Sequence, residues 1–331
     1  MKDYCHYSLL QHNTFGMEAR CSRFLQYESV EEACQVAAIL RTAGLPFVII
    51  GAGSNLLLTR DYEGIVVRSG MKGIANDNGS VTVASGECFD DFVAWSLSHG
   101  LYGLENLSLI PGDVGASAVQ NIGAYGVEVA SIIHEVETIE VATGQPRVFQ
   151  VQECEYGYRD SIFKNRLKGE YIVTAVVFRL SLIPKVNLDY GPLQAFKSQE
   201  GVPTAKAIRD AVIDIRRSKL PEPSVLGSAG SFFKNPVIPV EAYQEIAATY
   251  ADVPHYVVDD RHIKIPAAWL IEQCGWKGKQ HGEAAVYEKQ PLILVNMGNA
   301  TPDDIIELAA LIEQSVKEKF KIQLHPEVNY I

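Results

Sequence analysis

The sequence lacks any long apolar run. None of its stretches approaches the ~20 apolar residues that a membrane-spanning helix needs. Its first 15 residues, MKDYCHYSLLQHNTF, lack the apolar core of an export signal. From these absences we expect a cytoplasmic protein with no membrane segment.

Cysteine is also scarce, and its spacing excludes common uses of thiols. The six cysteines are widely separated and form no C-x-x-C pair: Cys5, Cys21, Cys34, Cys88, Cys154 and Cys274. This scatter predicts reduced thiols and no disulfide framework. The eight histidines contain no i, i+4 pair on an expected helix. We therefore expect no metal site.

Positive charge is in short supply. The 29 lysines and arginines are outnumbered by 40 aspartates and glutamates, which gives a formal net charge of -11. Long-range attraction to nucleic acid or to an anionic membrane is therefore not expected, and an anionic ligand needs a local cluster of cations. With 47% hydrophobic and 21% charged residues, the composition is typical of a globular protein.

At 331 residues the chain is long for a single core and predicts two or three domains. Ser29 with Glu32 forms a predicted capping box, and Thr301 with Pro302 predicts another helix start. The periodicity predicts helices at 29–44, 89–99, 204–218, 240–250, 266–274 and from 301. It predicts strands at 46–50, 81–85, 136–141, 147–151, 171–182 and 291–296. The mixture indicates an α+β fold, with a loop at 183–203 and a boundary near residue 220.

The segment 110–126, IPGDVGASAVQNIGAYG, is rich in small residues and fits neither helix nor strand periodicity. Its four glycines permit unusual backbone conformations and expose N–H groups that suit a diphosphate. A pair of ordinary surface turns is the alternative. The length of the segment favours a function, since long unstructured stretches are uncommon in compact domains.

A second glycine-rich stretch, Gly51 to Leu56, directly follows the expected strand 46–50. A strand followed by a glycine turn is the start of a dinucleotide-binding fingerprint. However, the third glycine of G-x-G-x-x-G is missing, and residues 55–58 do not open a helix. The sequence therefore argues against a Rossmann domain.

Two motifs supply candidate cationic groups. Arg159 lies in YGYRD, where its guanidinium can stack on an aromatic ring and grip a carboxylate. The alternative for Arg159 is a structural salt bridge. Arg216, Arg217 and Lys219 come at the end of an expected helix, where cations also complement the helix dipole.

Two further motifs supply a hydroxyl and a carboxyl. In GSAGSFFKNP, Ser231 stands between a glycine and two phenylalanines, which could leave its hydroxyl accessible beside a dry wall. A simple turn explains this motif equally well. Glu327 in HPE would be costly to bury unless it is paired or protonated, and an exposed tail carboxylate is the alternative.

The identity and order of these motifs resemble one family. The stretches GAGSNLL, IPGDVGASAVQNIGAYG, YGYRDSIFK, RRSKLPEP, GSAGSFFKNP and HPEV occur in this order. The chain resembles the UDP-N-acetylenolpyruvoylglucosamine reductases, the FAD enzymes of bacterial cell-wall peptidoglycan precursor synthesis. Residues 188–191, LDYG, resemble the subgroup that folds a tyrosine over its substrate.

The resemblance implies an FAD-binding fold of the p-cresol methylhydroxylase and vanillyl-alcohol oxidase type, followed by a C-terminal α+β substrate domain. It implies FAD-binding subdomains at 1–68 and 69–219 and a substrate domain at 220–331. FAD would be held without a covalent bond, NADPH would be the co-substrate, and the protein would act as a monomer.

The resemblance also assigns residues. The implied catalytic set is Arg159, Ser231 and Glu327. The implied FAD contacts are Gly51, Gly53, Ser54, Asn55, Leu56, Pro111, Gly112, Gly115, Ser117, Asn121, Gly123, Ala124 and Tyr125. The implied substrate contacts are Tyr190, Arg216, Lys219, Asn235, Tyr256, Lys264 and Gln290.

The implied reaction is the reduction of UDP-N-acetylglucosamine enolpyruvate to UDP-N-acetylmuramate. Two alternatives are another FAD oxidase of the same fold and a nucleotide-sugar-binding protein that has lost catalysis. The sequence shows no obvious histidine or cysteine in the loop for the covalent flavin common in such oxidases. An intact Arg159, Ser231 and Glu327 argue against the silent binder.

Overall fold

The computed structural model describes residues 1–198 and 203–331, and the chain divides into two compact units. Unit 1 consists of Met1–Ser8, Arg20–Ala52 and Tyr62–Arg216, and unit 2 of Leu9–Ala19, Gly53–Asp61 and Arg217–Ile331. The last division falls within helix α4 (Ala205–Lys219), close to the boundary expected near residue 220. The division into 1–68, 69–219 and 220–331 stays a prediction.

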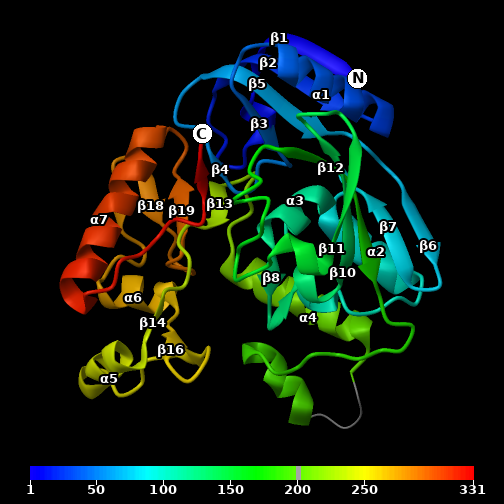
Figure 1. Ribbon diagram of the computed structural model, residues 1–331. Helices are drawn as coiled ribbons and strands as arrows, with labels where there is room; N and C mark the ends of the chain where they lie inside the picture. Colours follow the sequence, from blue (N-terminus) through cyan, green and yellow to red (C-terminus); the bar gives the residue numbers. More distant parts are fainter. Residues whose placement is uncertain (199–202) are drawn as a thin grey trace. The chain divides into compact units, whose positions relative to one another are not determined.

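The first sheet of unit 1 has the strand order β1-β2-β5-β3 (Figure 1). Its strands are β1 (Lys2–Ser8), β2 (Arg20–Tyr27), β5 (Tyr62–Ser69) and β3 (Phe47–Ile50). β2 and β3 both pair with β5 in parallel. Helix α1 (Val30–Thr42) buries Ala33, Val36, Ala37 and Leu40 in a core shared with Leu25 and Val67.

The second sheet of unit 1 is antiparallel, in the order β11-β10-β12-β7-β6. Its strands are β11 (Pro146–Gln150), β10 (Ile133–Glu140), β12 (Tyr171–Arg179), β7 (Ser80–Ala84) and β6 (Ile74–Asp77). Helix α2 (Phe89–Ser98) buries Phe89, Phe92 and Val93 in the core of this sheet. β10 and β11 pair as an antiparallel hairpin, whose turn contains Thr143 and Gly144.

One local expectation is wrong: segment 110–126 contains a helix, α3 (Val114–Gln120), and a small ladder of β8 (Gly123–Ala124) with β9 (Val127–Glu128). A Cβ on Gly115 would stand 2.8 Å from the Ser85 Cβ, so a glycine lets the helix backbone approach β7 closely. Seven residues with such small side chains give no apolar stripe, and periodicity therefore misses this helix.

Unit 2 is built on two small sheets, in the orders β13-β19-β18-β17 and β14-β16-β15. The first contains β13 (Gly227–Ser231), β19 (Ile293–Asn296), β18 (Ala284–Val286) and β17 (Gln280–His281). The second contains β14 (Val237–Pro239), β16 (His262–Lys264) and β15 (Tyr256–Val257). β20 (Asn329–Tyr330) pairs in parallel with β4 (Leu56–Leu57).

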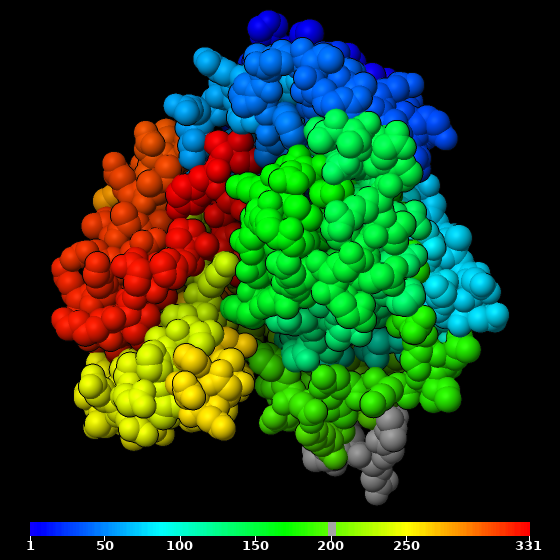
Figure 2. Space-filling model, in the orientation of Figure 1, coloured from blue at the N-terminus to red at the C-terminus, as the bar shows by residue number. Residues whose placement is uncertain are grey.

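Three helices complete the core of unit 2: α5 (Val240–Thr249), α6 (Ala267–Gln273) and α7 (Pro302–Phe320). α7 buries Ile305, Leu308, Ile312 and Val316 in the core of unit 2. α7 and the C-terminal segment after it, coloured orange to red, lie at the surface in Figure 2. Thr301 forms the predicted N-terminal cap, with Asp304 closing the capping box.

The expected loop at 183–203 contains a 3-10 helix at Gly191–Ser198, and part of it lies outside the described residues. Each of the six cysteines, all of which are described, is free of a disulfide, as predicted. Across residues 1–198 and 203–331 no helix is long and apolar enough to cross a membrane.

Candidate functional site

In unit 1 the two glycine-rich stretches pack closely against each other. A Cβ on Gly51, which follows β3, would stand 2.7 Å from the Ala116 Cβ on α3. Gly115 of α3 donates its N–H to the Ser85 carbonyl at 2.9 Å. Gly112, by contrast, has φ +126° and open space where a Cβ would point. The backbone before α3 is therefore accessible.

A buried carboxylate lies under this backbone. Asp113 is 6% exposed and forms an ion pair with Arg68 at 3.5 Å (Nη2 to Oδ2). Burial raises the pKa of Asp113 above its ordinary value, and the nearby Arg68 and Lys72 cations oppose that rise. Arg68 ends the long parallel strand β5, so the pair places charge at the carboxyl ends of parallel strands.

Arg159 is fixed against the segment that follows α3. Its guanidinium donates to the carbonyls of Asn121 and Gly123, and its Cζ lies 5.2 Å from the centre of the Tyr158 ring. The expected aromatic setting of Arg159 is therefore confirmed.

The turn that carries Arg159 is anchored to the same segment. The Asn121 amide donates to the Gly157 carbonyl at 2.7 Å, and its Oδ1 accepts the Ala130 N–H at 3.1 Å. Ser161, fully buried, donates to the Val119 carbonyl at 2.6 Å. Asn121 and Arg159 both have positive φ, of 44° and 55°. Strained backbone of this kind clusters at functional sites.

Tyr125, Tyr190 and Arg216 come together in unit 1. The Tyr125 and Tyr190 rings meet edge to face with centroids 6.1 Å apart, and Tyr190 is 36% exposed. Arg216 donates its Nε–H to the Leu109 carbonyl at 3.2 Å. Burial lowers the pKa of Arg216, and Tyr125 and Asp90 oppose that effect. Segment 110–126, which is assigned to FAD, is thus in contact with the loop at 188–191, which carries Tyr190.

The three cations at the end of α4 do not share one environment. Arg216 is half-buried among unit 1 residues, whereas Arg217 and Lys219 are exposed and belong to unit 2. Arg216 and Arg217 are neighbours and therefore point to different faces of the helix. Lys219 is the last residue of α4. The assignment of Arg216 and Lys219 to the substrate stays a prediction.

In unit 2, a segment that the sequence analysis missed supports the Gly53 loop. A Cβ on Gly53 would stand 1.9 Å from the His12 carbonyl oxygen, and one on Gly227 would stand 2.1 Å from that of Phe15. Thr14 donates its hydroxyl to the Ser228 carbonyl at 2.6 Å. The signal in the sequence was the short HNTFG motif, whose polar residues stand beside a glycine.

The backbones of Ser231 and Glu327 are linked through Phe232, the residue after Ser231. The Glu327 N–H donates to the Phe232 carbonyl at 2.7 Å, and Phe233 forms an isolated bridge with Pro326. Phe232 is fully buried, whereas Ser231 is exposed and Glu327 half-buried. Ser231 is thus an exposed residue directly before two buried phenylalanines, and the backbone of Glu327 is bonded to the first of them.

The predicted substrate residues of unit 2 lie on several of its elements. Tyr256 and Lys264 face each other across β15 and β16, with the Lys264 ammonium 5.8 Å from the ring centre. Asn235 accepts the Ala267 N–H at 2.9 Å and so also caps α6. Gln290 precedes β19, and its carbonyl accepts the Ile293 N–H at 3.0 Å.

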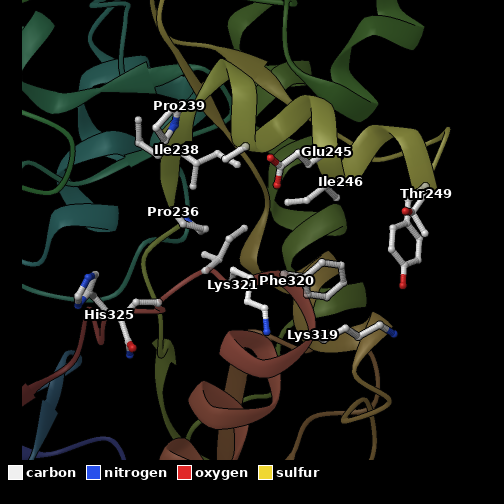
Figure 3. Close-up of a pocket in the computed structure, with 15 residues that line it drawn as sticks. Pro236, Ile238, Pro239, Glu245, Ile246, Thr249, Lys319, Phe320, Lys321 and His325 are labelled. Atoms are coloured by element: carbon white, nitrogen blue, oxygen red, sulfur yellow. The ribbon is translucent and has the colours of Figure 1, made fainter.

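A cavity of about 540 Å³ lies elsewhere in unit 2, between α5, β14 and the end of α7 (Figure 3). Ile238, Ile246 and Phe320 point into it, and Pro236 and His325 lie at its side. None of the residues assigned from the sequence lines it. The cavity is therefore not the predicted catalytic site.

Comparison with known proteins decides the family. A model of the UDP-N-acetylenolpyruvoylglucosamine reductase C-terminal domain matches residues 222–331, and a model of an FAD binding domain matches residues 22–150. The UDP-N-acetylenolpyruvoylglucosamine reductase of Bacteroides fragilis is 47% identical over 330 residues, covering 98% of this chain and 99% of the relative. The chain belongs to the UDP-N-acetylenolpyruvoylglucosamine reductase family.

Two further comparisons agree. The reductase of Porphyromonas gingivalis is 45% identical over 331 residues and covers 98% of each chain. The crystal structure of the Thermus caldophilus UDP-N-acetylenolpyruvylglucosamine reductase matches with a TM-score of 0.69 at 24% identity, covering 99% of this chain and 98% of that one. This structural match confirms the expected fold class, an FAD-binding fold followed by a C-terminal α+β domain.

The residues present in this reductase-family chain fit FAD. The accessible backbone at Gly112, beside closely packed Gly51 and Gly115, offers N–H groups to a diphosphate without side chains in the way. Some predicted contacts use their side chains elsewhere: Ser117 donates to the Val114 carbonyl, and Asn121 holds the Arg159 turn. Any contact of Ser117 or Asn121 with FAD would therefore involve the backbone.

Proposed function

We propose that this chain is an NADPH-dependent, FAD-containing reductase that converts UDP-N-acetylglucosamine enolpyruvate to UDP-N-acetylmuramate. The observation that carries the proposal is the 47% identity over nearly the whole of both chains to a UDP-N-acetylenolpyruvoylglucosamine reductase. The fixed environments of Arg159, Ser231 and Glu327 support it. The proposal includes a monomer acting in the cytoplasm.

Bound FAD would supply the hydride-transfer chemistry between NADPH and the terminal methylene carbon of the enolpyruvyl group. The protein must then deal with negative charge on the carbon next to the substrate carboxylate. The Arg159 guanidinium, fixed by the carbonyls of Asn121 and Gly123, is suited to stabilise that charge. Glu327 in its protonated form can hold the same charge by a hydrogen bond.

Ser231 completes the reduction as the general acid. Its Oγ–H donates a proton to the carbon next to the carboxylate, and the resulting alkoxide regains a proton from water. A serine is a weak acid in water, so this role needs an environment that stabilises the alkoxide. The position of Ser231, exposed to a ligand and directly before the buried residues Phe232 and Phe233, supports such a role once bound substrate excludes water.

The remaining polar residues bind the nucleotide sugar in this proposal. Tyr190, Arg216 and Lys219 are assigned to its diphosphate, and Asn235, Tyr256, Lys264 and Gln290 to its uridine and sugar. The Tyr190 ring is exposed and contacts Tyr125 of segment 110–126. This position supports its assignment as a cover over the substrate.

An anaerobic titration tests the function. Purified protein is expected to be yellow, to release FAD on denaturation, and to bleach when NADPH is added without oxygen. Addition of the enolpyruvyl nucleotide should restore the colour and yield UDP-N-acetylmuramate in the mass spectrum. Colour restored by oxygen alone would favour an oxidase of the same fold, and tight binding of the nucleotide without any bleaching would favour a silent binder.

A further inference from the structure

Asn55 links the loop assigned to FAD with the peptide of Glu327. Its side-chain amide donates to the Glu327 carbonyl at 3.2 Å. Its own carbonyl accepts the Asn329 N–H at 3.1 Å and the Asn329 side-chain amide at 3.2 Å. All of these residues belong to unit 2, and the C-terminal strand is seen beside β4 in Figure 1.

Glu327 is therefore fixed on both sides of its own Cα. Its N–H is bound by the Phe232 carbonyl, one residue after Ser231. Its carbonyl is bound by the Asn55 side chain, one residue before β4 begins. Loss of either bond frees one peptide plane next to the carboxyl-bearing residue.

The Asn55 side chain makes this link, and the β4–β20 pairing does not replace it. The parallel ladder joins Leu56 to Asn329 and Leu57 to Tyr330, so it begins two residues beyond Glu327. The Asn55 side chain is short and ends in an amide N–H donor, which fits the 3.2 Å distance from its Nδ2 to the Glu327 carbonyl oxygen. An aspartate of the same shape would set an acceptor against the carbonyl and repel it.

We propose that Asn55 is a positioning residue that holds Glu327 in register with Ser231 and couples the position of Glu327 to residues 53–56, the loop assigned to FAD that contains Asn55. The inference rests on the proposed function. Binding of FAD to residues 53–56 would then also order residues 325–329, because the Asn55 side-chain amide is bonded to the Glu327 carbonyl.

The chain supplies a matched control at the same junction. Asn329 also has a side-chain amide bonded to Asn55, but its backbone N–H binds the same carbonyl. Asn329→Ala therefore removes an amide and leaves the connection in place. Asn55→Ala and Asn55→Asp remove the donor to Glu327, and the aspartate variant preserves side-chain volume in case the alanine variant does not fold.

The first measurement is hydrogen–deuterium exchange with and without FAD, which needs no substrate. In the wild type and in Asn329→Ala, FAD should slow exchange in the peptide covering 325–329. In the Asn55 variants this protection should fall about tenfold or more, while FAD still protects the Gly112 segment. Equal protection of 325–329 in the wild type and the Asn55 variants would overturn the inference.

The second measurement is stopped-flow absorbance of the flavin. With FAD at saturating concentration, Asn55→Asp should slow reoxidation by the enolpyruvyl nucleotide about 10- to 100-fold, the cost of a slightly misplaced catalytic group, and should slow reduction by NADPH far less. In a Glu327→Gln background the same substitution should have little further effect. Full additivity of the two substitutions would overturn the inference, whereas a wild type that turns over no enolpyruvyl nucleotide would contradict the proposed function itself.

Discussion

Arg209 and Asp90 form a two-pronged ion pair in unit 1, with Nη1–Oδ1 at 2.6 Å and Nη2–Oδ2 at 3.0 Å. The Asp90 carboxylate also accepts the Leu109 N–H, and the Leu109 carbonyl accepts the Arg216 Nε–H. Leu109 has φ +59° and directly precedes segment 110–126, which is assigned to FAD. The pair therefore fixes both the start of that loop and an arginine assigned to the substrate.

The Asp90 pair predicts a pH-dependent contribution to stability. Burial raises the pKa of Asp90, but the Arg209 and Leu109 hydrogen bonds and the Arg216 charge together lower it below its ordinary value. A carboxyl whose folded pKa is depressed stabilises the fold above its unfolded pKa, about 3.9, and loses that effect as the pH falls through the folded pKa. Asp90→Asn should therefore lower the free energy of unfolding by roughly 1–3 kcal/mol near neutral pH.

Urea unfolding at about pH 7 and about pH 3 checks this prediction. The difference in the free energy of unfolding between Asp90→Asn and the wild type should be smaller at the lower pH. Asp210→Asn is the control, since its pair with Lys206 is exposed and should contribute less than about 0.5 kcal/mol. A gap of the same size at both pH values would show that Asp90 acts through packing and not through its charge.

Local signals in the sequence were sufficient for most helices and strands. Ser29 accepts the Glu32 N–H at the start of α1, and Thr301 caps α7, because capping needs only neighbouring residues. The sequence does not predict helix α3, because the reason for its small side chains is the backbone that packs against them. The Ser85 and Gly51 backbones that require them are distant in sequence.

The candidate site was recovered unevenly for the same reason. Arg159 and Ser231 stand in motifs whose neighbours already indicate stacking and a dry wall. The support for the Gly53 loop from Thr14 depends on a contact across 39 positions of the sequence, and Thr14 also contacts Ser228 across 214 positions. No periodicity or spacing rule detects such contacts. The pairing of Asn55 with Glu327 was undetectable from sequence for this reason too.

Gly53 should be far less tolerant of substitution than other glycines in the left-handed region. Gly53→Ala would bring a Cβ to 1.9 Å from the His12 carbonyl oxygen, with φ at +78°. The loss should be on the order of 4 kcal/mol or more. Gly16→Ala, at φ +67° with open space around it, should cost only about 1–2 kcal/mol. Thermal unfolding compares the two, and equal losses would contradict the packing argument.

Lys219→Ala should weaken binding of the enolpyruvyl nucleotide more than it slows flavin reduction. A cation at the diphosphate offsets the repulsion of a chain with net charge -11, and the affinity of the wild type should fall with added salt. Lys206→Ala, at the other end of α4 and paired with Asp210, is the matched control. If Lys219→Ala binds the nucleotide as the wild type does at low ionic strength, Lys219 is not a substrate contact.

Steady-state kinetics should follow a ping-pong pattern. The glycine-rich stretch at 51–56 builds no Rossmann site, since Gly53 is followed by the two-residue strand β4 and not by a helix. NADPH is therefore expected to use the pocket that later receives the enolpyruvyl nucleotide. Initial-rate lines should be parallel, and each substrate should inhibit at high concentration. Intersecting lines, or a ternary complex found in equilibrium binding, would exclude a shared pocket.

Ser231→Ala should separate the two halves of the reaction. Ser231 lies at the end of β13, outside both glycine-rich stretches, so the yellow flavin and its reduction by NADPH should stay nearly intact. Reoxidation by the enolpyruvyl nucleotide should slow by ~10²–10⁴-fold, the range for loss of a general acid. Stopped-flow absorbance follows each half directly. Equal slowing of both halves would mean that Ser231 positions the flavin or unit 2, and no slowing would assign the proton to Glu327 or to water.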